Sequence, residues 1–178
     1  MTLFEKVGAA GSALTVAIMI SMAADVASPV EAVTSPIEHF TEQFECLAQN
    51  IYFESRSESQ LAQRAVGYVT LNRVKSDLYP NSICEVVKQG VQKSDGTMVK
   101  DKCHFSWYCD GKPDTITEQD AWIEAQRVAY MVINNYDQFP DPVEGALMFH
   151  AAYVSPLWKY DYKRVTRIDK HIFYKLDQ

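Results

Sequence analysis

Apolar residues recur at helical spacing in the segment 44–58, which reads FECLAQNIYFESRSE. This spacing places them on one face of an α-helix, which we expect to begin near Thr41. The apolar positions are Phe44, Leu47, Ala48, Ile51 and Tyr52. The pattern predicts an amphipathic first helix that ends on an acidic, arginine-containing turn.

Three later segments also have a helical pattern. Residues 82–88 begin with Ser82-Ile83-Cys84-Glu85, a capping-box sequence that predicts a short helix. The longest helical run extends from about 117 to 136, with the Thr117 hydroxyl expected at its N-cap. Residues 61–74 carry small side chains that allow another helix to approach closely, namely Ala62, Ala65 and Gly67.

Extended structure is predicted in shorter regions. Ser94-Asp95-Gly96 is a turn sequence between two short extended pieces within 91–100. The segment 165–174 has some apolar–polar alternation, and 144–151 is short and apolar. Residues 103–111, CHFSWYCDG, mix small, polar and aromatic side chains between two cysteines. This composition suits a loop that lines a cleft, and a purely structural turn is the alternative.

The N-terminal part of the chain differs in composition from the rest. Residues 7–24 form an uncharged run, and a membrane-spanning helix needs about 20 such residues. We expect residues 1–24 to be an export signal peptide or an uncleaved signal anchor. Small residues mark two candidate cleavage sites, Ser21-Met22-Ala23 and Val30-Glu31-Ala32. Residues 25–40 have the composition of a linker, and residues 41–178 form the remaining domain.

Composition and charge narrow the class of protein. The chain has 178 residues, of which 47% are hydrophobic, and this suits one compact domain with a real core. The formal net charge of −6 argues against nucleic acid as a partner. Lysine and arginine gather after residue 158, but aspartates are interspersed with them, so we expect a solvated surface of mixed charge.

The chain contains four cysteines, Cys46, Cys84, Cys103 and Cys109. An even number in an exported chain favours disulfides, and three pairings are possible. Cys103 and Cys109 bracket the aromatic loop and could close it, in which case Cys46 and Cys84 would tie the first helix to a later segment. A tetrahedral zinc site needs more closely spaced ligand pairs. Disulfides are therefore favoured, and the sequence leaves their pairing open.

Glu54 is the first candidate for chemistry, because it lies on the shoulder of the apolar face of the first helix. Partial burial disfavours the charged carboxylate and raises its pKa. A carboxylic acid that keeps its proton near neutral pH is what a general acid requires. The alternative is a glutamate at the end of a helix that pairs with Arg56 on the surface.

Six motifs together resemble the spore-cortex-lytic type of cell-wall hydrolase. The first is CLAQNIYFESRSES, which is similar to the opening motif of that family. The others follow in the order of the family and cover most of residues 46–174: RAVGYVTLNRV, YPNSICEVV, CHFSWYCDG, MFHAAYVSPLW and TRIDKHIFY. One such motif would be weak evidence, but six in order are strong.

The resemblance implies an α+β, mainly helical, lysozyme-like fold with a small β-sheet. It also implies cleavage of the peptidoglycan glycan strand, without metal or cofactor, and Glu54 as the catalytic acid. Such enzymes are muramidases or lytic transglycosylases. Protonated Glu54 would protonate the glycosidic oxygen, and its carboxylate would then activate water or the sugar's own 6-hydroxyl. Candidates for a second carboxylate are Glu58, Asp110 and Asp114.

Substrate contacts are expected from side chains in the later motifs. Aromatic faces stack on sugar rings, while serine and histidine bond to hydroxyl or acetamido groups. The candidates are Ser106, Trp107, Tyr108, His150 and Tyr153. His171 is interpreted as structural, because it lies in an aromatic-rich strand.

We expect an exported protein that acts in the periplasm or cell wall as a monomer on peptidoglycan glycan strands. An uncleaved N-terminal segment would also hold it in the inner membrane. The compact chain with its weakly hydrophobic N-terminus is typical of a phage lysis enzyme, and a bacterial wall-remodelling enzyme is the alternative. Two other classes compete. One is a zinc amidase or peptidase that uses His104, His150, His171 and a carboxylate, and the other is a non-catalytic glycan-binding module.

Overall fold

The computed structural model describes residues 35–177, so the expected signal segment 1–24 and most of the expected linker 25–40 lie outside the described residues. The first helix, α1 (Pro36–Ser55), begins at Pro36 and not near Thr41. A capping box explains this start: the Ser35 N–H donates to the Glu38 carboxylate (2.8 Å), and the Glu38 N–H donates to Ser35 Oγ (3.2 Å). The linker prediction is therefore wrong for residues 36–40.

Three long helices form the core. α1 packs against α2 (Gln60–Val74) and α4 (Gln119–Asn135), and α2 also packs against α4. Gly67 allows this approach, because a Cβ there would lie 3.2 Å from Val132 on α4 and 3.3 Å from Ile51 on α1. The expected small-residue contact in the second helix is thus confirmed.

α4 differs from its prediction in two respects. It has 17 residues and is shorter than α1, which has 20. Its N-cap is Glu118, and no side chain caps it. The Thr117 and Glu118 N–H groups instead donate to the Tyr52 hydroxyl, at 3.2 and 3.1 Å. This buried tyrosine on α1 therefore fixes the point at which the chain enters α4.

One disulfide ties a later segment to this helical core, and the other closes a short loop. Cys46 on α1 is bonded to Cys84 on the short helix α3 (Ile83–Val87), and Cys103 is bonded to Cys109. Strands β1 (Gly90–Gln92) and β2 (Met98–Cys103) form an antiparallel hairpin around the predicted turn. A 3-10 helix, η1 (Ser106–Cys109), follows within the second disulfide.

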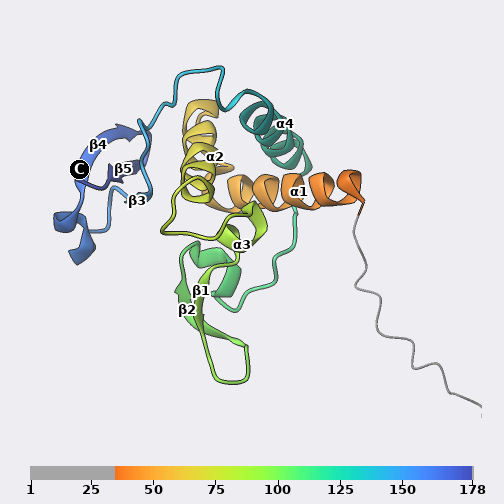
Figure 1. Ribbon diagram of the computed structural model, residues 1–178, viewed down its shortest axis with the longest axis horizontal. Coiled ribbons are helices and arrows are strands. Elements are labelled where there is room, and N and C mark those ends of the chain that lie inside the picture. Colours follow the sequence, from red (N-terminus) through yellow and green to blue (C-terminus); the bar gives the residue numbers. More distant parts are fainter. Residues whose placement is uncertain (1–34, 178) are drawn as a thin grey trace, which may run out of the picture. The chain divides into compact units, whose positions relative to one another are not determined.

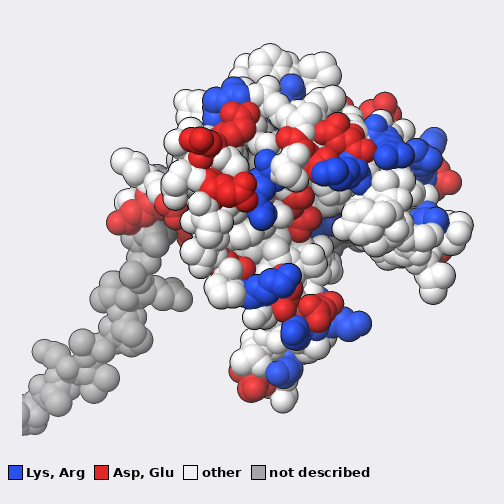
Figure 2. Space-filling model, turned by 180° about the vertical axis from the view of Figure 1, so that it is seen from behind, with Lys and Arg blue, Asp and Glu red and all other residues white. Residues whose placement is uncertain are grey.

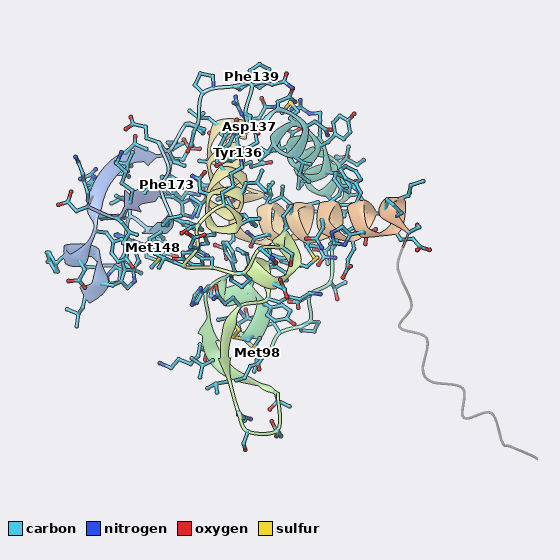
Figure 3. All side chains as sticks on the ribbon, in the orientation of Figure 1. Met98, Tyr136, Asp137, Phe139, Met148 and Phe173 are labelled. Atoms are coloured by element: carbon cyan, nitrogen blue, oxygen red, sulfur yellow. A yellow bond between two sulfur atoms is a disulfide. The ribbon has the colours of Figure 1, made fainter. Side chains whose placement is uncertain are left out.

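A separate antiparallel sheet is built from the C-terminal part of the chain, in the order β3–β5–β4. Its strands are β3 (Met148–Ala151), β4 (Lys163–Ile168) and β5 (His171–Lys175), and a second 3-10 helix, η2 (Leu157–Asp161), lies between β3 and β4. Figure 1 shows α2 between this sheet and α4. Met148 and Phe173 lie on the side of the sheet next to α2 (Figure 3). The fold is α+β and mainly helical, as predicted.

Charged side chains of both signs intermingle on the face shown in Figure 2, where lysine and arginine alternate with aspartate and glutamate. Six ion pairs in the described part of the chain are consistent with this mixing; Arg56–Glu118 and Lys75–Asp137 are examples. Exposed pairs of this kind stabilise a fold by about 0–1 kcal/mol each, so their main effect is on solubility.

Candidate active site

Glu54 lies in the last turn of α1, where two hollows meet. The first hollow has a volume of about 380 Å³, and its lining includes Tyr52, Phe53, Glu54, Ser106, Trp107 and Asp114. The second has a volume of about 340 Å³, and its lining includes Glu54, Arg73, His104, Ser106, Tyr153 and His171. Glu54 and Ser106 belong to both walls. A ligand that extends through both hollows therefore passes the Glu54 carboxyl group.

The environment of the Glu54 carboxyl group favours its protonated form. Burial raises the pKa of Glu54 from its ordinary value of 4.5 to about 7, and the Arg73 guanidinium offsets only part of this rise. The residue keeps some exposure towards the hollows, but protein atoms surround its carboxyl group. Glu54 belongs to none of the ion pairs among the described residues, and Arg56 pairs with Glu118 at 2.7 Å. The alternative of a Glu54–Arg56 surface pair is not what the structure contains.

The wall of the first hollow is fixed by a buried polar chain. Trp107 on η1 stacks on Phe53, with ring centroids 4.6 Å apart, and its indole N–H donates to Asn50 Oδ1 at 2.9 Å. Asn50 in turn donates to Thr70 Oγ1 on α2 at 3.1 Å. These contacts attach the disulfide-closed segment to α1 and α2, so Ser106 has a defined place beside Glu54.

Polar contacts join the α1–α2 connection to the β4–β5 turn. The Ser59 N–H donates to the Asp169 carboxylate at 2.7 Å, and the Lys170 Nζ lies 2.9 Å from the Glu58 carboxylate. The Lys170 N–H also donates to Glu58, at 3.3 Å. Because β5 starts at His171, these bonds bring the His171 ring to the hollow that Glu54 lines.

The predicted substrate-contact residues divide into two groups. Ser106, Trp107 and Tyr153 line the hollows beside Glu54, and Tyr153 is 85% exposed. Tyr108 packs against the core and lines neither hollow. His150 lines the second hollow, but protein groups engage both its ring nitrogens: Nδ1 donates to the Ala151 carbonyl (2.9 Å), and Nε2 pairs with the Tyr174 hydroxyl (3.0 Å).

Two residues at the site were not among the sequence candidates for binding. The sequence predicts a structural role for His171, and Arg73 lies within the predicted second helix without being singled out. Both are buried and both line the second hollow. A charged residue on a helix face that otherwise packs in the core was the available indication for Arg73, since arginine is rarely buried without a partner.

A larger hollow of the described chain lies elsewhere. It has a volume of about 630 Å³ and is lined in part by Lys75, Lys163, Lys175 and Asp177. Glu54 does not contribute to it, and Lys75 and Lys175 pair with Asp137 and Glu144. Volume alone does not identify an active site. We therefore assign the site from the buried carboxyl group of Glu54, whose pKa is raised.

In residues 35–177, no group of three or more histidine, cysteine, aspartate or glutamate side chains is arranged to hold a metal ion. Within the same limits, no helix has the length and hydrophobicity needed to span a membrane.

The fold and the site together define a lysozyme-like α+β domain, as the sequence predicted. The model of the Cell Wall Hydrolase family matches residues 57–174. The chain belongs to this family. The matched range begins just after Glu54, so the family match itself does not include that residue.

Known relatives agree with this assignment. The chain is 30% identical over 131 residues to the spore cortex-lytic enzyme of Bacillus subtilis (strain 168), a match that covers 71% of this chain and 35% of that enzyme. The chain thus spans about a third of the length of its curated relative. The crystal structure of the catalytic domain of the Bacillus cereus SleB protein matches with a TM-score of 0.56 and 26% identity, over 76% of this chain and 91% of that domain.

A second solved structure also matches, the catalytic domain of the germination-specific lytic transglycosylase SleB from Bacillus anthracis. Its TM-score is 0.52 and its identity 27%, and the match covers 82% of this chain and 100% of that one. The resemblance inferred from the six sequence motifs is therefore confirmed at the level of family and fold.

The raised pKa of Glu54 predicts a pH-dependent cost in stability. The folded chain holds the Glu54 proton up to about pH 7, whereas the unfolded chain releases it near 4.5. The free energy of unfolding should therefore fall as pH rises between these values, by about 3 kcal/mol. The Glu54→Gln variant should not show this loss. Its free energy of unfolding should therefore rise relative to that of the wild type from pH 4.5 to 7. Urea unfolding at several pH values measures the difference.

Glu45→Gln is the matched control, because Glu45 is exposed on the same helix. It should follow the wild type at every pH. A constant difference between the Glu54→Gln variant and the wild type across this range would contradict the burial argument.

Proposed function

We propose that this domain is an exported peptidoglycan glycosidase that cleaves the glycan strand between N-acetylmuramic acid and N-acetylglucosamine. The observation that carries the proposal is the buried Glu54 carboxyl group, with its raised pKa, on the shared wall of two hollows. A strand that occupies both hollows would present a glycosidic oxygen to this proton. Membership in the Cell Wall Hydrolase family supports the substrate class.

In the proposed mechanism, Glu54 first acts as a general acid. It donates its proton to the glycosidic oxygen as the bond to the anomeric carbon breaks and an oxocarbenium-like centre develops. Glu54 is then a carboxylate, and it removes a proton from the group that attacks the anomeric carbon. Attack by water gives hydrolysis, while attack by the 6-hydroxyl of the same sugar gives a 1,6-anhydro product.

We favour the second outcome, because the candidates for a second carboxylate are poorly suited to the task. Glu58 is bound to Lys170, and Asp110 pairs with Lys112 and accepts a hydrogen bond from its N–H group at 2.8 Å. Asp114 lines the first hollow, but it is exposed. Intramolecular attack needs only Glu54. The lytic transglycosylase among the matched structures supports this choice.

Mass spectrometry of digested peptidoglycan tests the reaction. We expect wild-type protein to release fragments that end in anhydromuramic acid. Reducing muramic acid ends would instead support hydrolysis, and a water-activating carboxylate would then have to be found. Free stem peptides without glycan cleavage would overturn the glycosidase proposal in favour of an amidase or peptidase.

For location and partners, we propose that residues 1–24 direct export, so that the domain acts in the periplasm or cell wall. Its partner there is the peptidoglycan glycan strand, and we propose that it acts as a monomer. Two disulfides support an oxidising compartment outside the cytoplasm. Transient attachment to the inner membrane would follow if the N-terminal segment is not cleaved, in either a phage lysis enzyme or a bacterial remodelling enzyme.

A further inference from the structure

Four buried side-chain nitrogen or oxygen atoms in the described part of the chain have no hydrogen-bond partner. They are Gln63 Oε1, Arg73 Nη1, Gln89 Oε1 and His171 Nδ1. Arg73 and His171 both line the second hollow with Glu54, and the other two residues do not. An unpaired buried polar group destabilises the fold, and a charged one does so more. Two residues that line the hollow beside Glu54 thus each have an unpaired polar atom. A ligand that bonds to these atoms would offset the lost stability.

Arg73 is held so that one end of its guanidinium stays free. Its Nε donates to the Leu147 carbonyl at 2.8 Å, and the guanidinium lies over the rings of Phe105 (4.7 Å) and Tyr79 (5.2 Å). The Nη2 atom lies 3.8 Å from the sulfur of Met148, a weak acceptor. The side chain is only 3% exposed, and these contacts fix its rotamer. The Nη1 donor is therefore held among these groups without a partner of its own.

His171 presents a second polar atom with a fixed position. The ring is 7% exposed and packs edge-on against Phe149, with ring centroids 5.2 Å apart. Burial lowers the pKa of His171, which keeps the imidazole neutral near pH 7. A neutral imidazole with its proton on Nδ1 donates one hydrogen bond from that atom.

We propose that Arg73 Nη1 and His171 Nδ1 bind an acyl oxygen, a carbonyl or a carboxylate, of the sugar that lies next to the scissile bond. A guanidinium and an imidazole N–H are both donors, so they suit an oxygen that only accepts. This inference rests on the proposed function, because it assumes a glycan in the second hollow. Two groups of peptidoglycan carry such an oxygen: the 2-acetamido group of either sugar and the 3-O-lactyl group of muramic acid.

The two sources predict different effects on specificity. A site built around a particular acceptor rejects ligands that lack it, because its donors are then left unpaired. If the bound oxygen belongs to the lactyl group, Arg73 makes the domain prefer peptidoglycan to chitin, which has no lactyl group. If it belongs to the acetamido group, Arg73 contributes equally to the binding of both polymers.

Calorimetric titration of Glu54→Gln protein, which keeps the hollow and lacks the acid, tests the inference. The ligands are a peptide-free peptidoglycan tetrasaccharide and the N-acetylglucosamine tetrasaccharide of chitin. Adding Arg73→Met should weaken binding about tenfold or more, and His171→Phe should weaken it several-fold. His171→Asn should restore most of the loss, since the asparagine amide lies near the position of Nδ1. Gln63→Met is the matched control, a buried polar residue of the same helix that does not line the hollow.

Each outcome decides the inference. Loss of affinity for the peptidoglycan ligand alone supports the lactyl oxygen, and equal loss for both ligands supports the acetamido oxygen. Unchanged affinity in folded Arg73→Met and His171→Phe proteins overturns the inference, as does failure of the Glu54→Gln protein to bind either ligand. If the wild type binds through Arg73 but releases no fragments, the proposed function fails and the binding site stands.

Discussion

Replacing Glu54 by glutamine is expected to lower the rate of glycan-strand cleavage about 1,000-fold, because proton transfer by a positioned acid or base contributes 10²–10⁴ to an enzymatic rate. Glutamine has nearly the same shape and keeps the two hollows, but it has no proton to donate to the glycosidic oxygen. It also cannot become the carboxylate that the second step requires. Release of soluble fragments from purified peptidoglycan sacculi, at fixed protein concentration near pH 6, measures the effect.

Asp114→Asn is the matched control for this variant. Asp114 lines the first hollow together with Glu54, and partial loss of hydration together with the nearby Asp110 raises the pKa of this exposed residue. If a single carboxylate suffices, Asp114→Asn should keep activity within about tenfold of the wild type. A loss as large as that of Glu54→Gln would mean that Asp114 takes part in the chemistry. Near-normal activity of the Glu54→Gln protein would remove the basis of the assignment.

The environment of Glu54 could be predicted because it depends on local spacing. The apolar residues of α1 fix which face of the helix is buried, and Glu54 follows Ile51 by three positions. Partial burial and a raised pKa were the expectation from this position, with a surface pair to Arg56 as the alternative. The same argument gave the close contact at Gly67, since a residue without a side chain on a buried helix face brings two helices together.

The roles of the histidines could not be predicted, because they depend on strand pairing between distant segments. In the β3–β5 pair, Ala151 lies opposite His171, and His150 lies opposite Ile172. This register directs the nitrogens of His150 to Ala151 and Tyr174, while the Glu58–Lys170 contact brings His171 to the hollow. A shift of one residue would exchange the two faces. Nothing local in the sequence fixes that register.

Arg73 shows a different limit. Its place on the buried side of α2 follows from periodicity, but its partners come from a segment more than seventy residues later, at Leu147 and Met148. Whether a buried guanidinium is fully paired or keeps a free donor depends on these contacts. The free Nη1 atom is therefore visible only in the folded structure, although the residue itself could be singled out from the sequence.

Removing the Cys46–Cys84 disulfide is expected to have the largest effect on stability. The bond joins two buried cysteines that are separated by 38 residues, and it links α1 to α3 within the core. In the chain-entropy model, a closed loop of this length stabilises the folded state by about 4 kcal/mol. The Cys46→Ala, Cys84→Ala double variant should lose about this much free energy of unfolding in urea titrations, because its unfolded chain is no longer constrained.

The Cys103–Cys109 disulfide provides the control, since it closes a loop of only 6 residues. The same model gives it about 2 kcal/mol, so its double alanine variant should unfold at higher urea concentration than the first variant. Removing this second disulfide should nevertheless impair saccharide binding more than removing the first. It encloses η1, which places Ser106 and Trp107 in the wall beside Glu54. We therefore expect weaker saccharide binding from the less destabilised variant. A larger stability loss at Cys103–Cys109 than at Cys46–Cys84 would contradict the assignment of one disulfide to the core and the other to the site.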